Sequence, residues 1–203
     1  VGAVTWVNGS APVSGVVGSA NSLIGVAIND QVGSGGVVPL ANGNYVVSSP
    51  LWDKGAVPDV GAVTWMSGTG ALPGVVSAAN SLTGSAVGDQ VGSGGVASLA
   101  GGNYVVSSPY WHNVGAATWM SGTAASAGVV GNTNSLVGSA TGDQVGYALF
   151  PLSSGHYLVG SNYWDNGTEL NVGAVTWGNG SIGVSGVLGL SLIHISEPTR
   201  RYA

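Results

Sequence analysis

The chain has 203 residues, only 5% of which are charged, and its net charge is −5. Between Val1 and Gly189 the sole basic residue is Lys54. Nucleic acids and anionic membrane surfaces attract clustered Lys and Arg, so neither is expected as a partner. The chain has no Cys, which excludes disulfides and thiolate metal sites. Gly, Ser, Asn and Pro interrupt every apolar run well before the roughly 20 residues of a membrane helix, and no membrane insertion is expected.

The hexapeptide VGAVTW opens the chain and returns as one member of a long repeat. Copies start at residues 1, 60 and 172, and VGAATW starts at 114. NSL, DQVG and NYVVSSP recur in the same order around them. This pattern indicates one supersecondary unit copied along the chain. Because the first residue falls at a repeat boundary and no initiator Met or signal peptide precedes it, we expect an internal piece of a longer protein, with neighbouring repeats as partners.

Four strands are predicted in each unit, taken from one DQVG onward. Short Val-rich segments separated by Gly, Asn and Ser clusters are typical of strands. The glycines between the first two segments favour a tight hairpin, since Gly accepts positive φ. No segment keeps the apolar spacing of a helix. In the second copy the predicted antiparallel meander comprises residues 92–99, 103–108, 115–120 and 128–136.

Apolar residues fall on both alternating faces of these strands. Val63 and Trp65 share one face, whereas Ala62 and Thr64 share the other. A sheet covered on both faces has this pattern. With copies 59, 54 and 58 residues apart, the repeat is closer to a β-propeller blade of roughly 40 to 50 residues than to a shorter solenoid coil.

The predicted fold is therefore all-β, an array of about three propeller blades. Since a closed propeller needs roughly four to eight blades, we expect an open arc with exposed strand edges. The blades are centred on residues 33–84, 92–138 and 146–189, within a tandem repeat region at 1–189.

The run from Gly88 to Trp119 resembles the FG-GAP repeat of integrin-type β-propellers. Val91-Gly92 stands for the Phe-Gly pair, and Ser107-Ser108-Pro109 for the Gly-Ala-Pro triplet. The whole repeat is similar to repeats of unknown function in large secreted bacterial adhesins of the filamentous haemagglutinin type. That resemblance implies an extracellular or bacterial cell-surface location.

Integrin-type repeats often carry an Asp-x-Asp-x-Asp-Gly calcium loop in the first hairpin. The corresponding hairpins here read PLANGNY, SLAGGNY and PLSSGHY. Without carboxylates they cannot bind a hard cation in the same way, and we predict no structural metal and no cofactor.

Trp52, Trp111 and Trp164 recur in the loop between the second and third strands. Indole rings there could stack on sugars, or could pack over the edge of a blade. The strand residues Trp6, Trp65, Trp119 and Trp177 are instead predicted to lie in the core.

Asp30, Asp89 and Asp143 share another repeat position. A ring of carboxylates could bind metal, but an Asp in a turn more often accepts backbone N–H bonds, and the structural role is preferred. No catalytic constellation is visible, so an enzyme is not expected.

Near-identical copies favour a structural or adhesive repeat region of a secreted or cell-surface protein. A spacer or multivalent surface needs only repetition, whereas one catalytic site would need one deviant cluster. The expected partner is a glycan or a cell-surface protein. A carbohydrate-binding, lectin-like propeller is the alternative.

The last residues, 190–203, depart abruptly from the repeat. The text LSLIHISEPTR resembles the conceptual translation of a transposon-end sequencing adapter. We expect this tail to be foreign to the protein and unpacked on the blades.

Overall fold

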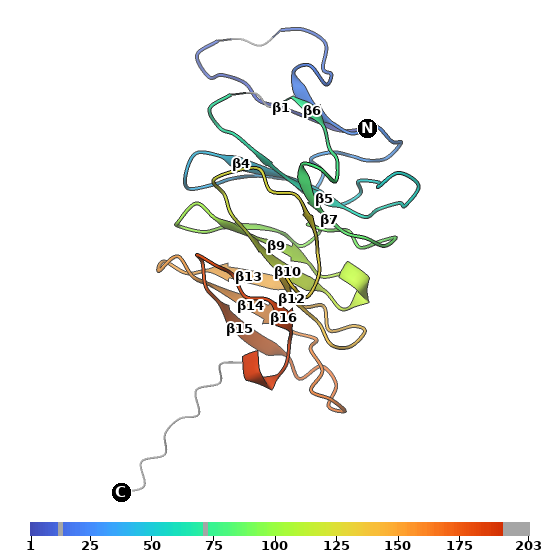
Figure 1. Ribbon diagram of the computed structural model, residues 1–203, viewed down its shortest axis with the longest axis vertical. Helices are drawn as coiled ribbons and strands as arrows, with labels where there is room; N and C mark the ends of the chain where they lie inside the picture. The colour runs from blue at the N-terminus through green and yellow to red at the C-terminus, as the bar shows by residue number, and fades with distance from the viewer. Residues whose placement is uncertain (12–13, 71–72, 193–203) are drawn as a thin grey trace, which may run out of the picture.

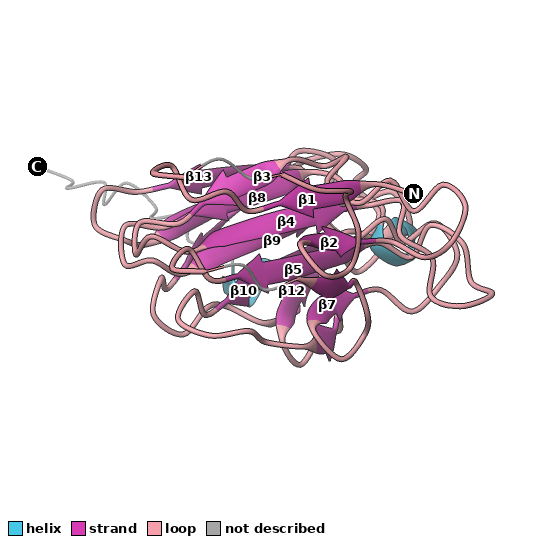
Figure 2. Cartoon of the chain, turned by 90° about the horizontal axis from the view of Figure 1, so that it is seen from above, coloured by secondary structure: helices cyan, strands magenta, loops and turns pink. Residues whose placement is uncertain are grey.

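The computed structural model describes residues 1–11, 14–70 and 73–192, and these form an all-β stack of sheets along one axis (Figure 1). Seen along that axis, strands of successive sheets lie nearly over one another (Figure 2). The strands in chain order are β1 Ala3–Thr5, β2 Ser22–Ile24, β3 Val37–Pro39, β4 Tyr45–Ser49, β5 Ala62–Met66, β6 Gly74–Val75, β7 Ser81–Thr83, β8 Gly95–Ser98, β9 Tyr104–Ser108, β10 Ala116–Met120, β11 Gly128–Val129, β12 Ser135–Val137, β13 Ala148–Pro151, β14 Tyr157–Ser161, β15 Ala174–Gly178 and β16 Gly186–Val187.

The two middle sheets have the same five-stranded order. Sheet 2 is ordered β3-β4-β5-β7-β11, and sheet 3 is ordered β8-β9-β10-β12-β16. In each, a hairpin pairs antiparallel with the VGAVTW-type strand, which pairs antiparallel with the NSL-type strand. The fifth strand is parallel and comes from the following repeat. The all-β repeat is thereby confirmed.

The prediction of a four-stranded antiparallel meander was wrong at its fourth strand. The predicted segment 128–136 divides into β11, which joins sheet 2, and β12, which joins sheet 3. Asn134 holds the turn between them: its Oδ1 accepts the Gly131 N–H at 3.0 Å, and its Nδ2 donates to the Val129 carbonyl at 3.0 Å. Each repeat thus reaches back and adds a short strand to the sheet before it. We call residues 67–75, 121–129 and 179–187 the crossover segments.

The sheets at the two ends hold different parts of the five-stranded order. Sheet 1, β1-β2-β6, has the counterparts of the last three strands, and sheet 4, β13-β14-β15, has those of the first three. Among the described residues, β1 and β15 therefore lie at sheet edges. These two strands carry the same VGAVTW motif.

Apolar side chains fill the space between successive sheets in three clusters. Val105 of sheet 3 shares one cluster with Val159 of sheet 4, and Val106, on the opposite face, shares another with Val46 of sheet 2. Val63 and Ala62 likewise enter different clusters, on the two faces of sheet 2. Burial of both faces, predicted from the alternating residues, is confirmed for the middle sheets.

The segment that departs from the repeat is described only as far as Leu192. Leu190–Leu192 forms a 3-10 turn, η2, and Leu192 packs against the cluster between sheets 3 and 4. The expectation of an unpacked tail is wrong for this residue, because its side chain is partly buried against that cluster. The remainder of the expected tail, 193–203, lies outside the described residues. The described chain includes no helix long and apolar enough to cross a membrane.

Candidate functional site

The repeated Asp residues serve as internal caps that join two loops. Asp89 is 1% exposed, and its Oδ2 accepts the backbone N–H groups of Ser85 at 2.7 Å and Ala86 at 2.8 Å. Its Oδ1 accepts the N–H of His112 at 3.0 Å. Asp30 and Asp143 repeat this arrangement with equivalent partners.

The preferred structural role of these aspartates is therefore confirmed. Each carboxylate is already occupied by donors from its own loop and from the loop after the second strand of its unit. Within the described part of the chain, no group of three or more His, Cys, Asp and Glu side chains could hold a metal ion.

The candidate sugar platforms Trp52, Trp111 and Trp164 are buried, with 5%, 8% and 4% exposure. Each belongs to one of the clusters between sheets. Stacking on a sugar requires an open indole face, so these rings do not provide the predicted platform. The alternative was that they pack over the edge of a blade, and the structure agrees with a packing role because each indole lies in an apolar cluster. His112 stacks on Trp111 with ring centroids 4.2 Å apart.

The core packing predicted for the strand tryptophans is seen in part: Trp65 and Trp119 pack against the clusters between sheets, whereas Trp177 is 37% exposed. Trp65 and Trp119 are only partly buried, and their Nε1 atoms donate to the carbonyls of Gly122 and Gly180, each at 2.9 Å. The acceptor lies in the crossover segment of the next repeat. Asn44 and Asn103 donate to the same two carbonyls. The recurring indole and amide thus bind successive repeats together.

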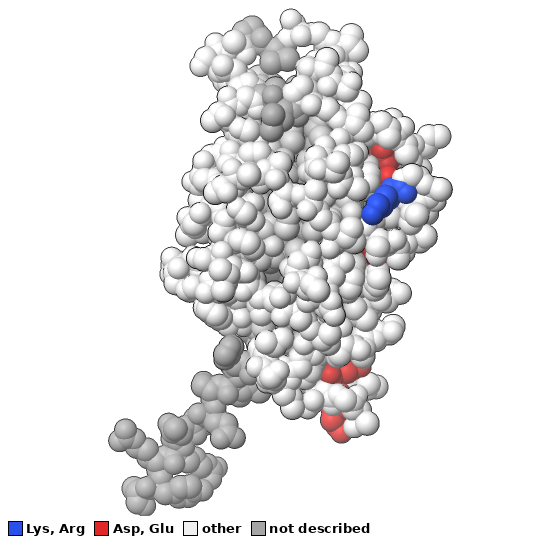
Figure 3. Space-filling model, viewed as in Figure 1, with Lys and Arg blue, Asp and Glu red and all other residues white. Residues whose placement is uncertain are grey.

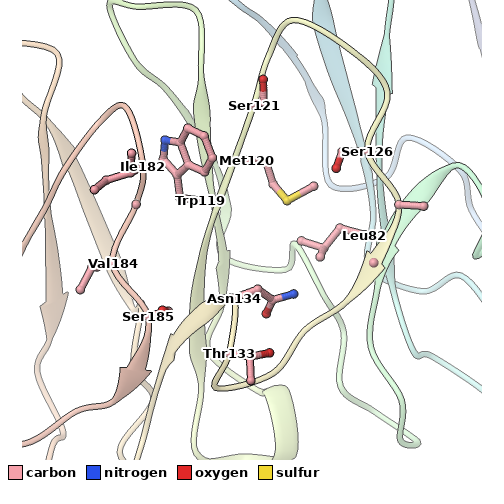
Figure 4. Close-up of a pocket in the computed structure, with 13 residues that line it drawn as sticks. Leu82, Trp119, Met120, Ser121, Ser126, Thr133, Asn134, Ile182, Val184 and Ser185 are labelled. Atoms are coloured by element: carbon pink, nitrogen blue, oxygen red, sulfur yellow. The ribbon is translucent and has the colours of Figure 1, made fainter.

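A hollow of about 320 Å³ lies between two of these crossover segments (Figure 4). Trp119 and Met120 come from β10, Ser126 from one crossover segment, and Ile182 and Val184 from the next. The hollow is within the usual size range of ligand pockets, at its lower end. Its complete lining is uncharged: Leu82, Trp119, Met120, Ser121, Ser126, Ala127, Gly128, Thr133, Asn134, Ile182, Gly183, Val184 and Ser185.

A smaller, polar hollow of about 280 Å³ lies beside the hairpin of sheet 4. His156 lines it with Asn103 and Ser153, and its Nδ1 accepts the Gly180 N–H at 3.2 Å. The His156 ring also contacts Trp177, with centroids 4.8 Å apart. No carboxylate lines this hollow, so an acid–base pair has no second member there.

Charge is sparse on the face shown in Figure 3 and gathers on the turns along one side. Lys54 is the one Lys or Arg within the described ranges. Most of this surface is neutral, which suits uncharged ligands better than phosphate-bearing ones.

Sequence reasoning missed the hollow beside Trp119 because its walls come from three separate segments. Leu82 reaches it from the preceding repeat, and Ile182 from the following one. The available signal was the recurrence of a Trp two residues before each crossover segment and of Ser-Gly or Asn-Gly at its start, which indicates a shared contact but not an open space.

Comparison with known proteins identifies the repeat itself. A family model described as a repeat of unknown function (DUF5650) matches residues 1–34, 39–93, 98–147 and 151–191. The chain belongs to this family of repeats. The second and third matched segments contain the three central strands of sheets 2 and 3, together with the crossover segment that adds a strand to the preceding sheet. No curated protein matches the chain.

Proposed function

We propose that the chain is a non-catalytic structural repeat region that supports adhesion or extracellular scaffolding. The supporting observation is the use of its repeated polar groups: Asp89 caps loops, while Trp119 and Asn103 bond to the next repeat. Repeated side chains that form hydrogen bonds within the chain stabilise a rod or a multivalent surface. Such side chains do not provide the convergent set of titratable groups that catalysis needs.

The stacked sheets are proposed to be blades of an FG-GAP-like propeller on the surface of a bacterial cell, in an adhesin of the filamentous haemagglutinin type. The sheets lie face to face, and each repeat adds a short parallel strand to the sheet before it, which supports this arrangement. Electron microscopy of a tandem array extended by whole repeats tests it. Ring-shaped particles at four to eight blades are expected, and a rod that lengthens with each added repeat would contradict the propeller.

The adhesive role is tested by binding of the purified chain to immobilised host-cell surface proteins and to cells, alongside a hydrolase activity panel. Saturable cell binding without turnover of any substrate is the expected result. Turnover that a single-residue change abolishes would defeat the non-catalytic proposal.

The hollow beside Trp119 favours a second candidate function, carbohydrate binding. Neutral sugars combine apolar ring faces with hydroxyl groups, and this lining offers an indole, aliphatic side chains and hydroxyls without charge. A glycan array on the chain tests this role. Ala127→Phe places a ring at the hollow and should abolish binding, whereas Ala125→Phe, on the same crossover segment but outside the lining, should leave it unchanged. Equal effects of the two changes would exclude the hollow as the glycan site.

A further inference from the structure

The repeat that forms sheet 4 differs from the two before it by one exposed pair of aromatic rings. Tyr147 and Tyr163 contact each other edge to face, with ring centroids 5.5 Å apart and ring planes at 82°. Tyr147 follows its DQVG motif directly, where the other two copies have Ser34 and Ser93. A serine offers no ring, so this pair is a single-copy feature of a chain whose other polar and aromatic groups recur.

Short main-chain turns position both rings. Tyr147 comes just before β13 and Tyr163 just after β14, and these strands pair antiparallel, which brings the two residues to the same end of the hairpin. The Tyr147 N–H donates to the Gln144 carbonyl at 3.1 Å, and the Trp164 N–H donates to the Ser161 carbonyl at 3.2 Å. Rings held on such turns are preorganised, so little backbone freedom is lost when a ligand binds.

The exposure of this pair does not come from its place in the last sheet. Tyr147 is 47% exposed and Tyr163 is 41% exposed. Tyr110 takes the place of Tyr163 in sheet 3 and is 51% exposed, although that sheet has a neighbour on both faces. In the place of Tyr147, Ser34 is exposed and Ser93 is half-buried. The Tyr163 position therefore lies on the side of the stack, where a following sheet would not cover it.

The chemistry of the pair fits a neutral sugar. The apolar face of a sugar ring stacks on an aromatic face, and in an edge-to-face pair the ring that presents its edge keeps both faces clear of its partner. Phenol hydroxyls can donate to and accept from sugar hydroxyls. Lys54, the one Lys or Arg in the described ranges, lies in the loop after β4 and not in this repeat. An anionic sugar would therefore find no cation beside these rings.

The size of the pair also favours a small ligand over a protein. A tyrosine side chain buries at most about 250 Å². Each partner in a stable protein interface buries about 800 Å². Two rings are thus too small a surface for a stable protein partner, but are sufficient to hold one or two sugar rings.

We propose that Tyr147 and Tyr163 form a stacking platform for a neutral sugar residue on the side of the stack. The platform is separate from the hollow beside Trp119, whose lining includes neither tyrosine. It shares its ligand class with the carbohydrate binding proposed above, but it does not depend on that hollow. A repeat of this kind would gain a ligand site where tyrosine replaces the serine that follows DQVG.

Binding of the full chain to an array of neutral oligosaccharides of glucose, galactose, mannose and N-acetylglucosamine tests the platform. The tightest binder is then titrated while the ring-proton chemical shifts of Tyr147 and Tyr163 are followed by NMR. Saturable shifts of both rings, with a dissociation constant of about 10 mM or lower, are expected. Binding of none of these sugars, or shifts confined to residues around Trp119, would overturn the proposal.

Three substitutions connect the binding to this pair of rings. Tyr147→Ser introduces the residue of the other two repeats and should weaken binding about three- to tenfold, because one ring is lost. Tyr163→Leu, which introduces the residue that follows Pro50 in sheet 2, should have a similar effect. Tyr110→Leu is the matched control, since it makes the same exchange in sheet 3 where no second ring is present, and it should leave the affinity unchanged. Equal loss of affinity in the control would overturn the proposal.

Ala127→Phe separates the platform from the hollow. This change fills the hollow and should leave the sugar-induced shifts of the two tyrosine rings unchanged. If it abolishes those shifts, the rings respond to a sugar in the hollow, so the platform is overturned while the second candidate function stands. If Tyr147→Ser abolishes the shifts and Ala127→Phe does not, the platform is supported whether or not the hollow binds a glycan.

Discussion

At the scale of single residues, the repeated Asp is the polar group on which each unit depends most. Asp89→Ala leaves three backbone N–H donors without their acceptor, two of them within 2.8 Å of Oδ2 in the native protein. We expect a loss of about 3 kcal/mol or more in the free energy of unfolding, measured by urea denaturation. Asp53→Ala is the control: the Asp53 carboxylate accepts a hydrogen bond from the Asp59 N–H at 2.9 Å, and its loss should cost about 1 kcal/mol. Equal losses would contradict the capping role.

Buried tyrosines make the fold sensitive to alkaline pH. Burial raises the pKa of Tyr104 above its usual value. Burial also raises the pKa of Tyr157, to about 12, and outweighs the opposing effect of a backbone hydrogen bond with Val184. Above about pH 10 the unfolded chain releases these protons while the folded chain keeps them, so stability is present below pH 10 and falls as pH rises. Above pH 10 the free energy of unfolding should fall by about 1.4 kcal/mol per pH unit for each tyrosine, measured by urea denaturation from pH 8 to 12.

Tyr104→Phe provides the check on this pH dependence. The Tyr104 hydroxyl is buried without a hydrogen-bond partner, so its removal should be neutral or stabilising at pH 7. The variant should also lose less stability above pH 10 than the parent chain. An unchanged alkaline slope would show that Tyr104 does not contribute to it.

At the scale of elements, the contact between a strand and the next crossover segment is the joint between repeats. Trp119→Phe keeps most of the ring but removes the bond from Nε1 to the Gly180 carbonyl, and should cost about 1 kcal/mol. Asn103→Ala removes the amide donor to the same carbonyl. In a double-mutant cycle the two changes should couple by about 0.5 kcal/mol or more, because the first leaves the acceptor still bonded. Strict additivity in thermal or urea melts would contradict a shared joint.

Local elements of this chain were predictable from sequence, and pairings between repeats were not. The hairpin joint at Ala100-Gly101-Gly102 forms as expected, with Gly102 N–H donating to Leu99 and Leu99 N–H donating to Asn103. The pairing of Gly128 with Leu82 joins residues of different repeats, and no local signal marks it. For the same reason Trp111 was considered a sugar platform: a loop position does not show whether a neighbouring sheet covers the ring.

At the scale of the molecule, we predict that calcium does not stabilise the fold, because the repeated aspartates already accept backbone N–H groups. Titration with calcium to millimolar concentration should shift the melting temperature by less than about 1 °C, since a stabilising ligand must bind the folded state preferentially. The chelator EDTA should be equally without effect. A rise of several degrees with calcium would show that the repeats hold a hard cation and that the prediction of no structural metal is wrong.

The stack should be most stable at its centre, because each repeat gains stability from both neighbours. Val46 and Val105 are fully buried between sheets, whereas Leu158, their counterpart on sheet 4, is only partly buried. Truncation to Ala should therefore cost about 2 to 3 kcal/mol at Val105 and clearly less at Leu158, in urea denaturation. Native-state hydrogen exchange should show the slowest amides in β9 and β10 and faster exchange in β1 and β15. Equal protection along the whole chain would instead indicate one cooperative unit, in which the end sheets open only when the centre unfolds.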